Sequence, residues 1–221
     1  TCMSALLTFA CLLMTNSQQH EHGYVSELAP IEPKTQLEAR ASPQALKWKI
    51  AEQIELKTIW DMGTFKVVDK PRHVIPLPSR FTYKLKLDEA GNIARFKARL
   101  VARGDLQTTD EYSSTFSPTS RFTAIRTIVS IATQENMQLK HWDITGAFMT
   151  ADIDTDLYME LPPGYTLPEG KCIKLQKSLY GLKQSSGLFH ANLEKWLLAY
   201  GFQPVGADRV IFRLQKPSGE K

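Results

Sequence analysis

The feature that most constrains the fold of this chain is a period-two alternation of apolar and polar residues between residues 80 and 104. Apolar positions alternate through residues 81–87, give way to the turn sequence Asp-Glu-Ala-Gly at residues 88–91, and the alternation resumes at Ile93. Successive side chains of a strand point to opposite faces, so this spacing predicts a two-stranded antiparallel hairpin.

The polar positions of the predicted hairpin are strongly basic. Seven lysines and arginines stand there against Asp88 and Glu89, so the hairpin carries +5 while the whole chain carries +4. Such a face is either a solvated strand surface or a surface that binds phosphate groups, and the pattern leaves both interpretations open. The basic residues are Arg80, Lys84, Lys86, Arg95, Lys97, Arg99 and Arg103.

A single carboxylate, Asp143, stands near the end of a second alternating run, residues 139–144, which we predict to be a central strand. The small-residue turn of residues 146–148 follows at once. An aspartate at a strand end can present its oxygens to a hard cation. It can equally cap the turn that follows, which is the commoner role.

Helical periodicity predicts three helices, and with the strands it indicates an α+β fold. The first begins at Ser42-Pro43 and has an apolar face made of Leu46, Ile50, Ala51 and Ile54. The second covers residues 122–138, and we expect its apolar face to pack against the sheet behind Asp143. The third covers residues 186–200, and further strands are predicted at residues 157–161, at 172–175 and from 210.

Residues 1–43 are predicted to be a leader and linker that is largely disordered, with residues 44–221 forming the folded part. Residues 16–43 are rich in Gln, Glu, Pro and Ser. The apolar stretch of residues 5–14 is shorter than the roughly 20 residues that a membrane span requires, and no Lys or Arg precedes it. Three scattered cysteines predict no disulfide framework. We therefore expect an intracellular protein without a membrane partner.

Several sequence blocks occur in an order typical of one family. They include D-I-T-G-A-F-M, L-Y-M-E-L-P-P-G-Y and K-S-L-Y-G-L-K-Q-S, preceded by R-F-K-A-R-L-V-A-R-G and T-F-S-P-T-S-R. In this order they resemble the reverse transcriptase of copia-type (Pseudoviridae) retrotransposons, over roughly residues 45–214. The resemblance implies the fingers and part of the palm of a right-hand polymerase.

The resemblance also implies roles for single residues. Asp143 would bind Mg²⁺ as the catalytic carboxylate, and Ile144 would offer its backbone carbonyl to the metal. Phe148 would lie under the sugar and exclude a 2′-hydroxyl, and Lys97 and Arg99 would grip the triphosphate. The remaining implied contacts are Tyr180 and Gly181 with the nucleotide, and Arg80, Lys84, Lys86, Lys183 and Gln184 with nucleic acid.

Two departures from the family pattern bear on activity. The family's Tyr-x-Asp-Asp hairpin is missing, since the sequence contains no adjacent pair of aspartates. Ser186, Gly187 and Phe189 stand where the family has Pro, Arg and Trp. We therefore expect a fragment, truncated before that motif, which does not polymerise by itself although its intact parent would.

Partners implied by the resemblance are an RNA template, a DNA primer and a deoxynucleoside triphosphate, with the integrase and RNase H parts of the polyprotein as further candidates. The parent's setting would be a virus-like particle in the cytoplasm, or the nucleus. Two other readings stay open. The chain is a catalytically dead remnant that still binds nucleic acid, or it is an inert and barely stable product.

Overall fold

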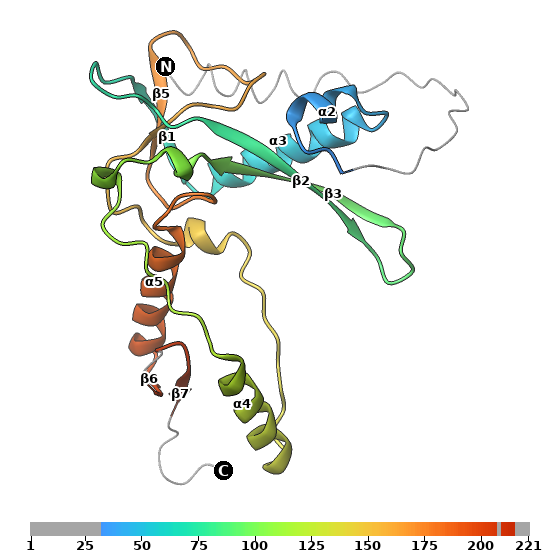
Figure 1. Cartoon of the computed structure of the whole chain (residues 1–221), viewed down its shortest axis with the longest axis vertical. Coiled ribbons are helices and arrows are strands. Elements are labelled where there is room, and N and C mark those ends of the chain that lie inside the picture. Colours follow the sequence, from blue (N-terminus) through green and yellow to red (C-terminus); the bar gives the residue numbers. More distant parts are fainter. Residues whose placement is uncertain (1–31, 207–208, 215–221) are drawn as a thin grey trace. The chain divides into compact units, whose positions relative to one another are not determined.

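The computed structural model describes residues 32–206 and 209–214, which belong to one compact unit that begins at Glu32. It combines helices with small antiparallel sheets, so the predicted α+β class is confirmed (Figure 1). No helix in this part of the chain is long and apolar enough to cross a lipid bilayer. The main elements are α2 (Gln36–Ala41), α3 (Ala45–Asp61), β1 (Phe65–Asp69), β2 (Ser79–Leu87), β3 (Ile93–Ala102), α4 (Phe122–Gln134), β4 (Tyr158–Met159), β5 (Lys171–Leu175), α5 (Ser185–Ala199), β6 (Phe202–Pro204) and β7 (Phe212–Leu214).

Strands β2 and β3 form the predicted antiparallel hairpin, with Lys84 directly opposite Lys97. The pleat divides its side chains as the alternation indicates. One face holds the buried Phe81, Tyr83 and Leu100. The opposite face carries the basic side chains, and we call it the basic face: Arg80, Lys84, Lys86, Arg95, Lys97 and Arg99.

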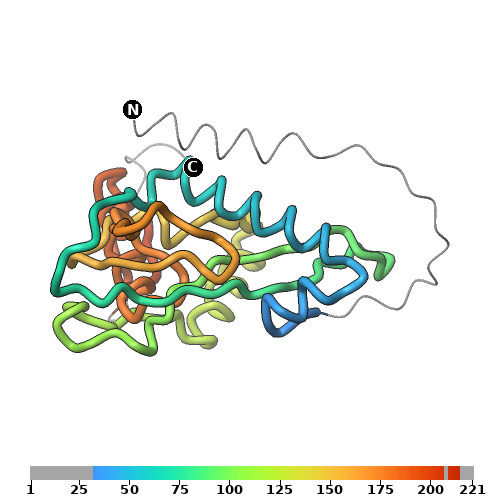
Figure 2. Tube along the Cα trace, turned by 90° about the horizontal axis from the view of Figure 1, so that it is seen from above, coloured from blue at the N-terminus to red at the C-terminus, as the bar shows by residue number. Residues whose placement is uncertain are grey.

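Helix α3 lies along the hairpin (Figure 2) and contacts β3. Its Trp48 is buried edge-to-face against Tyr83 and Phe96, with ring centroids 5.3 and 4.7 Å apart. The helix was predicted, but its start and its buried face were not: it begins at Ala45, and Ser42, predicted as its cap, instead ends α2. Leu46, Ile50 and Ile54 are exposed, because the side that meets the hairpin is the one bearing Trp48, Ala51, Glu52 and Ile59.

The buried Glu52 links α3 by hydrogen bonds to three other segments of the chain. Its carboxylate accepts hydrogen bonds from the hydroxyls of Tyr83 at 2.5 Å and Tyr165 at 2.8 Å, and from the Arg40 guanidinium at 2.6 Å. A buried charge is tolerated only when it is paired and hydrogen-bonded in this way. The contact with Arg40 also shows that residues 32–43, predicted as linker, join the folded unit through α2. Residues 1–31, the remainder of the predicted leader and linker, lie outside the described residues.

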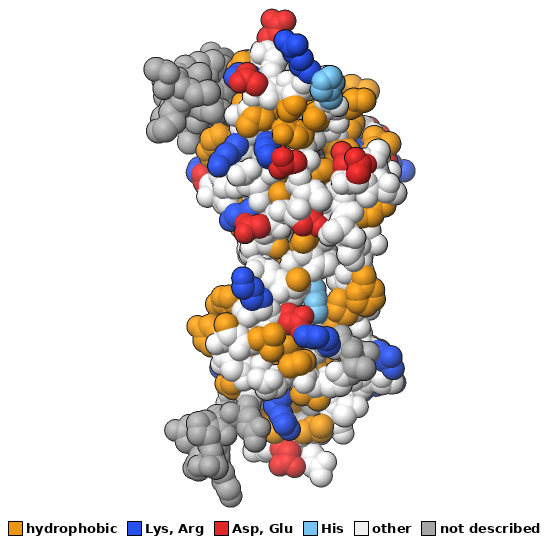
Figure 3. Space-filling view, turned by 90° about the vertical axis from the view of Figure 1, so that its left-hand side faces the viewer, with side chains coloured by type: hydrophobic (Ala, Val, Ile, Leu, Met, Phe, Trp, Pro, Cys, Tyr) orange, Lys and Arg blue, Asp and Glu red, His pale blue; other side chains and the backbone are white. Residues whose placement is uncertain are grey.

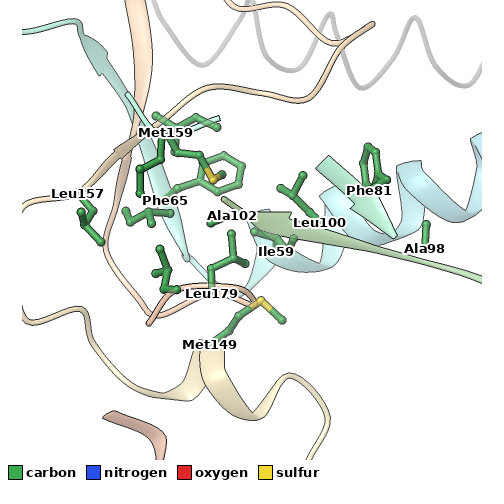
Figure 4. Packing of buried hydrophobic residues seen from close by; sticks show 14 of the residues in the cluster. Ile59, Phe65, Phe81, Ala98, Leu100, Ala102, Met149, Leu157, Met159 and Leu179 are labelled. Atoms are coloured by element: carbon green, nitrogen blue, oxygen red, sulfur yellow. The ribbon is translucent and has the colours of Figure 1, made fainter. Parts of the chain in front are cut away.

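A second sheet has the strand order β1-β5-β4 and is antiparallel throughout. Strand β4 lies within the predicted region 157–161, β5 begins one residue before the predicted region 172–175, and β1 was not predicted. Buried side chains from this sheet, α3 and the hairpin form one continuous core (Figure 4). Fully buried members include Ile59, Leu100, Leu157, Ile173 and Leu179.

Helix α4 and the segment after it differ from the predictions. The helix exists, yet Phe122, Ile125 and Val129 are exposed and only Ala132 is buried, so it does not pack its apolar face as expected. Residues 139–144, predicted as a central strand, have no regular secondary structure. A period-two pattern is a local signal, whereas a strand also needs a hydrogen-bonded neighbour. Hydrophobic patches are visible between charged side chains on the face shown in Figure 3.

Candidate nucleic-acid interface

Tyr180 is the point at which several of the predicted site residues meet. The guanidinium of Arg99 lies 5.3 Å from the centre of the Tyr180 ring, and Phe148 packs edge-to-face against that ring at 5.2 Å. Burial raises the pKa of the Tyr180 phenol; Arg99 opposes this rise, and the carboxylates of Glu55 and Asp143 add to it. Arg99 and Phe148, which are far apart in the sequence, therefore contact one aromatic ring, and the charge of Asp143 also bears on the pKa of its phenol.

Buried neighbours in the sequence fix the positions of these residues. Arg99 precedes Leu100, Phe148 precedes Met149, and Tyr180 follows Leu179. The three apolar side chains all belong to the core shown in Figure 4. Well-packed interiors hold side chains in defined rotamers, so the core sets the spacing of the adjoining site residues.

The glycine of the Tyr-Gly-Leu-Lys-Gln block is required by a contact within the protein. Gly181 has φ +92°, and a Cβ there would stand 2.2 Å from the carbonyl oxygen of Ala102. The Ala102 N–H donates to the Tyr180 carbonyl at 2.8 Å, so the segment around Tyr180 lies against the edge of β3 that does not pair with β2. The close approach that we predicted between Gly181 and a nucleotide is thus made, in this structure, with the β3 backbone.

Lys97 stands half-buried on the basic face beside Arg95 and Arg99. Burial lowers the pKa of this lysine, Arg99 and Arg95 lower it further, and Glu55 opposes them. Glu55, on α3, accepts a hydrogen bond from the Leu100 N–H at 3.3 Å. Burial raises the pKa of Glu55, while that hydrogen bond and the charge of Lys97 act in the other direction.

Glu32 occupies the equivalent place on the free edge of β2. Its carboxylate accepts the Leu85 N–H at 2.9 Å and pairs with Lys84 at 3.0 Å. The hydrogen bond from Leu85 lowers the pKa of Glu32, and Lys84 lowers it further. Lys86 and Arg80 are exposed on the same face as Lys84.

Lys183 and Gln184 are engaged inside the protein. The Lys183 ammonium donates to the Gln107 carbonyl at 2.9 Å and lies over the Tyr112 ring. Gln184 is fully buried, where its amide accepts from Gln107 at 3.1 Å and donates to the Glu111 carbonyl at 3.0 Å. These contacts give Gln184 a structural role, and its full burial argues against the predicted contact with nucleic acid.

The residues that sequence reasoning missed are Glu32 and Glu55. Glu32 lay in the segment predicted as linker, and nothing in its neighbourhood marks it. Glu55 lies in a helix whose buried face was assigned incorrectly, and its partner Leu100 is 45 residues away. No local pattern indicates such a contact, since it depends on how α3 lies against β3.

Comparison with known proteins decides the family. A family described as reverse transcriptase (RNA-dependent DNA polymerase) matches residues 62–220. The chain belongs to the copia-type reverse transcriptases. It is 34% identical over 199 residues to the retrovirus-related Pol polyprotein from transposon RE1 of Arabidopsis thaliana, covering 87% of this chain and 13% of that protein.

Other copia-type relatives agree. The Pol polyprotein from transposon TNT 1-94 of Nicotiana tabacum is 31% identical over 184 residues, covering 82% of this chain and 14% of the relative. The transposon Ty1-BL Gag-Pol polyprotein of Saccharomyces cerevisiae is 35% identical over 175 residues, covering 77% and 9%. The chain therefore spans less than a sixth of the length of these relatives. No solved structure matches it significantly.

Copia-type reverse transcriptases are polymerases of a family that generally uses a divalent metal ion. The described residues offer Asp143, an exposed carboxylate, next to Ile144 with its backbone carbonyl oxygen. Nowhere in residues 32–206 or 209–214 do three His, Cys, Asp or Glu side chains gather as a metal-binding group. Divalent cations are usually held by several anionic oxygens, so these residues alone do not make up a complete site.

Proposed function

We propose that this chain contributes the phosphate-gripping and nucleotide-positioning part of a copia-type reverse transcriptase, corresponding to the fingers and part of the palm. The packing of Arg99 and Phe148 against Tyr180, at the edge of the basic face, is the observation that supports it best. Cations on a rigid strand grip phosphates, and an aromatic wall beside them limits the space for a sugar and base.

In this proposal Lys97 and Arg99 bind the triphosphate of the incoming nucleotide. Phe148 lies under its sugar and excludes a 2′-hydroxyl, while Tyr180 and the backbone at Gly181 line the pocket. Phe148 is suited to a steric role because Tyr180 and Phe189 hold its ring on two sides, at 5.2 and 6.3 Å. Template and primer phosphates would bind along Arg80, Lys84 and Lys86, with Lys183 at the margin.

Nucleotidyl transfer is proposed for the parent polyprotein. Asp143 and the Ile144 carbonyl would bind Mg²⁺ there together with the carboxylates of a Tyr-x-Asp-Asp motif, which this sequence lacks. The ion supplies Lewis-acid stabilisation of charge on the reacting phosphate. We expect no primer extension from this chain alone. The parent would be intracellular, and integrase and RNase H parts of the polyprotein would be its neighbours.

A second candidate is nucleic-acid binding without chemistry. The scarcity of converging carboxylates among the described residues favours it, since the basic face does not depend on them. The two candidate functions differ only in whether the parent protein catalyses primer extension. A catalytic parent extends a primer, whereas a remnant binds RNA–DNA duplex and does nothing further.

The binding proposal is tested by measuring the affinity of the chain for an RNA–DNA hybrid at several salt concentrations. Changing Lys97 and Arg99 together to Ala should weaken binding and reduce the slope of log affinity against log salt by about 1 to 2, since each lost phosphate contact removes roughly 0.9. The matched control changes two exposed lysines away from the basic face, Lys66 and Lys195, to Ala. Equal slopes in both variants would contradict the proposal.

The catalytic role of Asp143 is tested in a parent protein that carries Tyr-x-Asp-Asp. Asp143→Asn should abolish metal-dependent primer extension while hybrid binding is retained, because the amide keeps the shape and loses the charge that holds the ion. Asp152→Asn, at an exposed aspartate nearby in the sequence, is the control and should extend normally. Extension by the Asp143 variant at the normal rate would remove this residue from the metal site.

A further inference from the structure

We propose that the Leu85 N–H and the Lys84 ammonium form a phosphate-binding site at the free edge of β2, and that Glu32 is a built-in competitor for it. The carboxylate of Glu32 occupies this site until a phosphate of the nucleic-acid backbone replaces it. The inference rests on the proposed function, because it adds one regulated contact to the basic face.

The Glu32 carboxylate makes the contacts that a phosphate would make. Its Oε1 accepts the Leu85 N–H at 2.9 Å and lies 3.0 Å from the Lys84 ammonium. Its Oε2 accepts from the same ammonium at 3.1 Å. Carboxylates and phosphates both accept charge-assisted hydrogen bonds of this kind. The position is therefore an anion site whose present occupant belongs to the chain itself.

Lys84 differs from its neighbours on the basic face. Within the part of the chain that the structure describes, it is the one member of that face that forms a salt bridge. The Leu85 N–H beside it lies on the strand edge that does not pair with β3. A backbone donor on such an edge needs an acceptor. An anion that displaces Glu32 supplies an oxygen to both donors, so neither is left unsatisfied.

The contact is built so that it can exchange. The side chains of Glu32 and Lys84 are 37% and 62% exposed, and exposed ion pairs are weak. The neighbouring Pro33 is buried, and Arg40 on α2 donates to the buried Glu52 at 2.6 Å. The segment thus stays anchored while the Glu32 side chain rotates away. The Leu85 hydrogen bond, and then Lys84, lower the pKa of Glu32, so its carboxylate is charged at neutral pH.

The first test measures the affinity of the chain for an RNA–DNA hybrid at several salt concentrations. Glu32→Gln removes the charge and keeps an amide oxygen for the Leu85 N–H. It should tighten binding by up to about fivefold, the size of effect that an exposed ion pair can have. The slope of log affinity against log salt should steepen by up to about 0.9, because Lys84 becomes available for one more phosphate.

The matched control is Glu89→Gln, at an exposed glutamate in the turn of the same hairpin. It makes the same change of charge without touching the site, so its gain in affinity should be clearly smaller. Equal gains in the two variants overturn the inference, since the effect would then be a general one of net charge.

Lys84→Ala separates competition from general electrostatics. Removing a negative charge favours any anion whether or not Lys84 is present, whereas competition requires Lys84. In the Lys84→Ala background, Glu32→Gln should therefore change hybrid binding much less than it does alone. A gain of undiminished size in that background overturns the inference.

Inorganic triphosphate distinguishes the two sources of phosphate. If the site takes backbone phosphates, Glu32→Gln strengthens binding of the hybrid and affects binding of triphosphate no more than Glu89→Gln does. A gain for triphosphate without one for the hybrid overturns the assignment to the nucleic-acid backbone.

The exchange itself is followed by NMR of the unchanged chain, with the carboxyl carbon of Glu32 assigned by its loss in Glu32→Gln. As hybrid is added, this signal should move towards that of an unpaired carboxylate, and the Leu85 amide signal should shift with it. Hybrid that binds without moving either signal overturns the inference and leaves the proposed function standing. If neither the unchanged chain nor Glu32→Gln binds hybrid at any salt concentration, the proposed function fails as well.

Discussion

Gly104 lies so close to the backbone of Gly181 that it cannot carry a side chain. A Cβ on Gly104 would stand 2.0 Å from the carbonyl oxygen of Gly181, and a Cβ on Gly181 would stand 2.2 Å from the carbonyl oxygen of Ala102. The contact joins the end of β3 to the Tyr-Gly-Leu-Lys-Gln block, where the Ala102 N–H also donates to Tyr180. Arg99 and Tyr180 therefore keep their relative positions through two glycines.

Gly181→Ala should lower the free energy of unfolding more than Gly170→Ala does. Both glycines have positive φ, +92° and +73°, but only Gly181 has backbone within reach of a new Cβ. The control carries only the conformational cost, and Gly181→Ala adds an overpacking penalty of about 1 to 3 kcal/mol. Chemical denaturation of both variants measures the difference, and equal losses would show that the loop simply moves aside.

Removing the buried carboxylate of Glu52 should be far more costly than removing one of its donors. Glu52→Ala leaves the Arg40 charge and two tyrosine hydroxyls without their acceptor, and losing one partner of such a pair costs about 3 to 5 kcal/mol. Tyr165→Phe deletes a single hydrogen bond and should cost about 1 kcal/mol. Urea unfolding compares the two, and similar small losses would mean that Glu52 is readily solvated.

Stability should fall as the pH rises above that of ordinary tyrosine ionisation, near pH 10. Burial and then the hydrogen bond to Glu52 raise the pKa of both Tyr83 and Tyr165. The folded chain keeps these protons when the unfolded chain has lost them, so the stabilisation is complete below pH 10 and declines above it.

The measurement is the unfolding free energy as a function of pH, with phenolate absorbance as a second signal. In Tyr83→Phe/Tyr165→Phe the alkaline decline should become shallower. A decline of the same steepness in that variant would place its origin in other groups.

Substitution on the exposed face of α4 should be nearly neutral. Ile128→Lys changes a side chain that is 42% exposed and should alter the unfolding free energy by less than about 0.5 kcal/mol. Leu100→Ala, in the core, should cost about 2 to 5 kcal/mol. Thermal unfolding of both variants makes the comparison, and a loss at Ile128 as large as that at Leu100 would show that α4 is packed.

Features that depend on neighbouring residues were predicted from the sequence, and features that depend on distant segments were not. The hairpin was predicted with its basic face, because alternation of side chains is decided within each strand and the turn follows directly. Helix α3 was also predicted, yet its buried face was not. Leu46 and Ile50 look more apolar than Glu52, and only the tyrosines and Arg40, brought in by other segments, make burial of Glu52 favourable.

The candidate site shows the same division. The sequence indicated Arg99, Phe148, Asp143 and Tyr180 as residues of interest, through their place in the family blocks. It did not indicate that Tyr180 lies between Arg99 and Phe148, nor that Gln184 is buried. The predicted strand before Asp143 was wrong because pairing, unlike alternation, needs a partner strand.

By itself, then, the sequence determined the period and charge of the β2–β3 hairpin, the existence of the main helices and the family to which the chain belongs. Tertiary structure alone decided which face of α3 is buried, that Gly181 meets Ala102, and that Glu55 accepts a hydrogen bond from the Leu100 backbone. The physical reason is range. Periodicity and turn preference act over a few residues, whereas burial and charge pairing act between segments that only folding brings together.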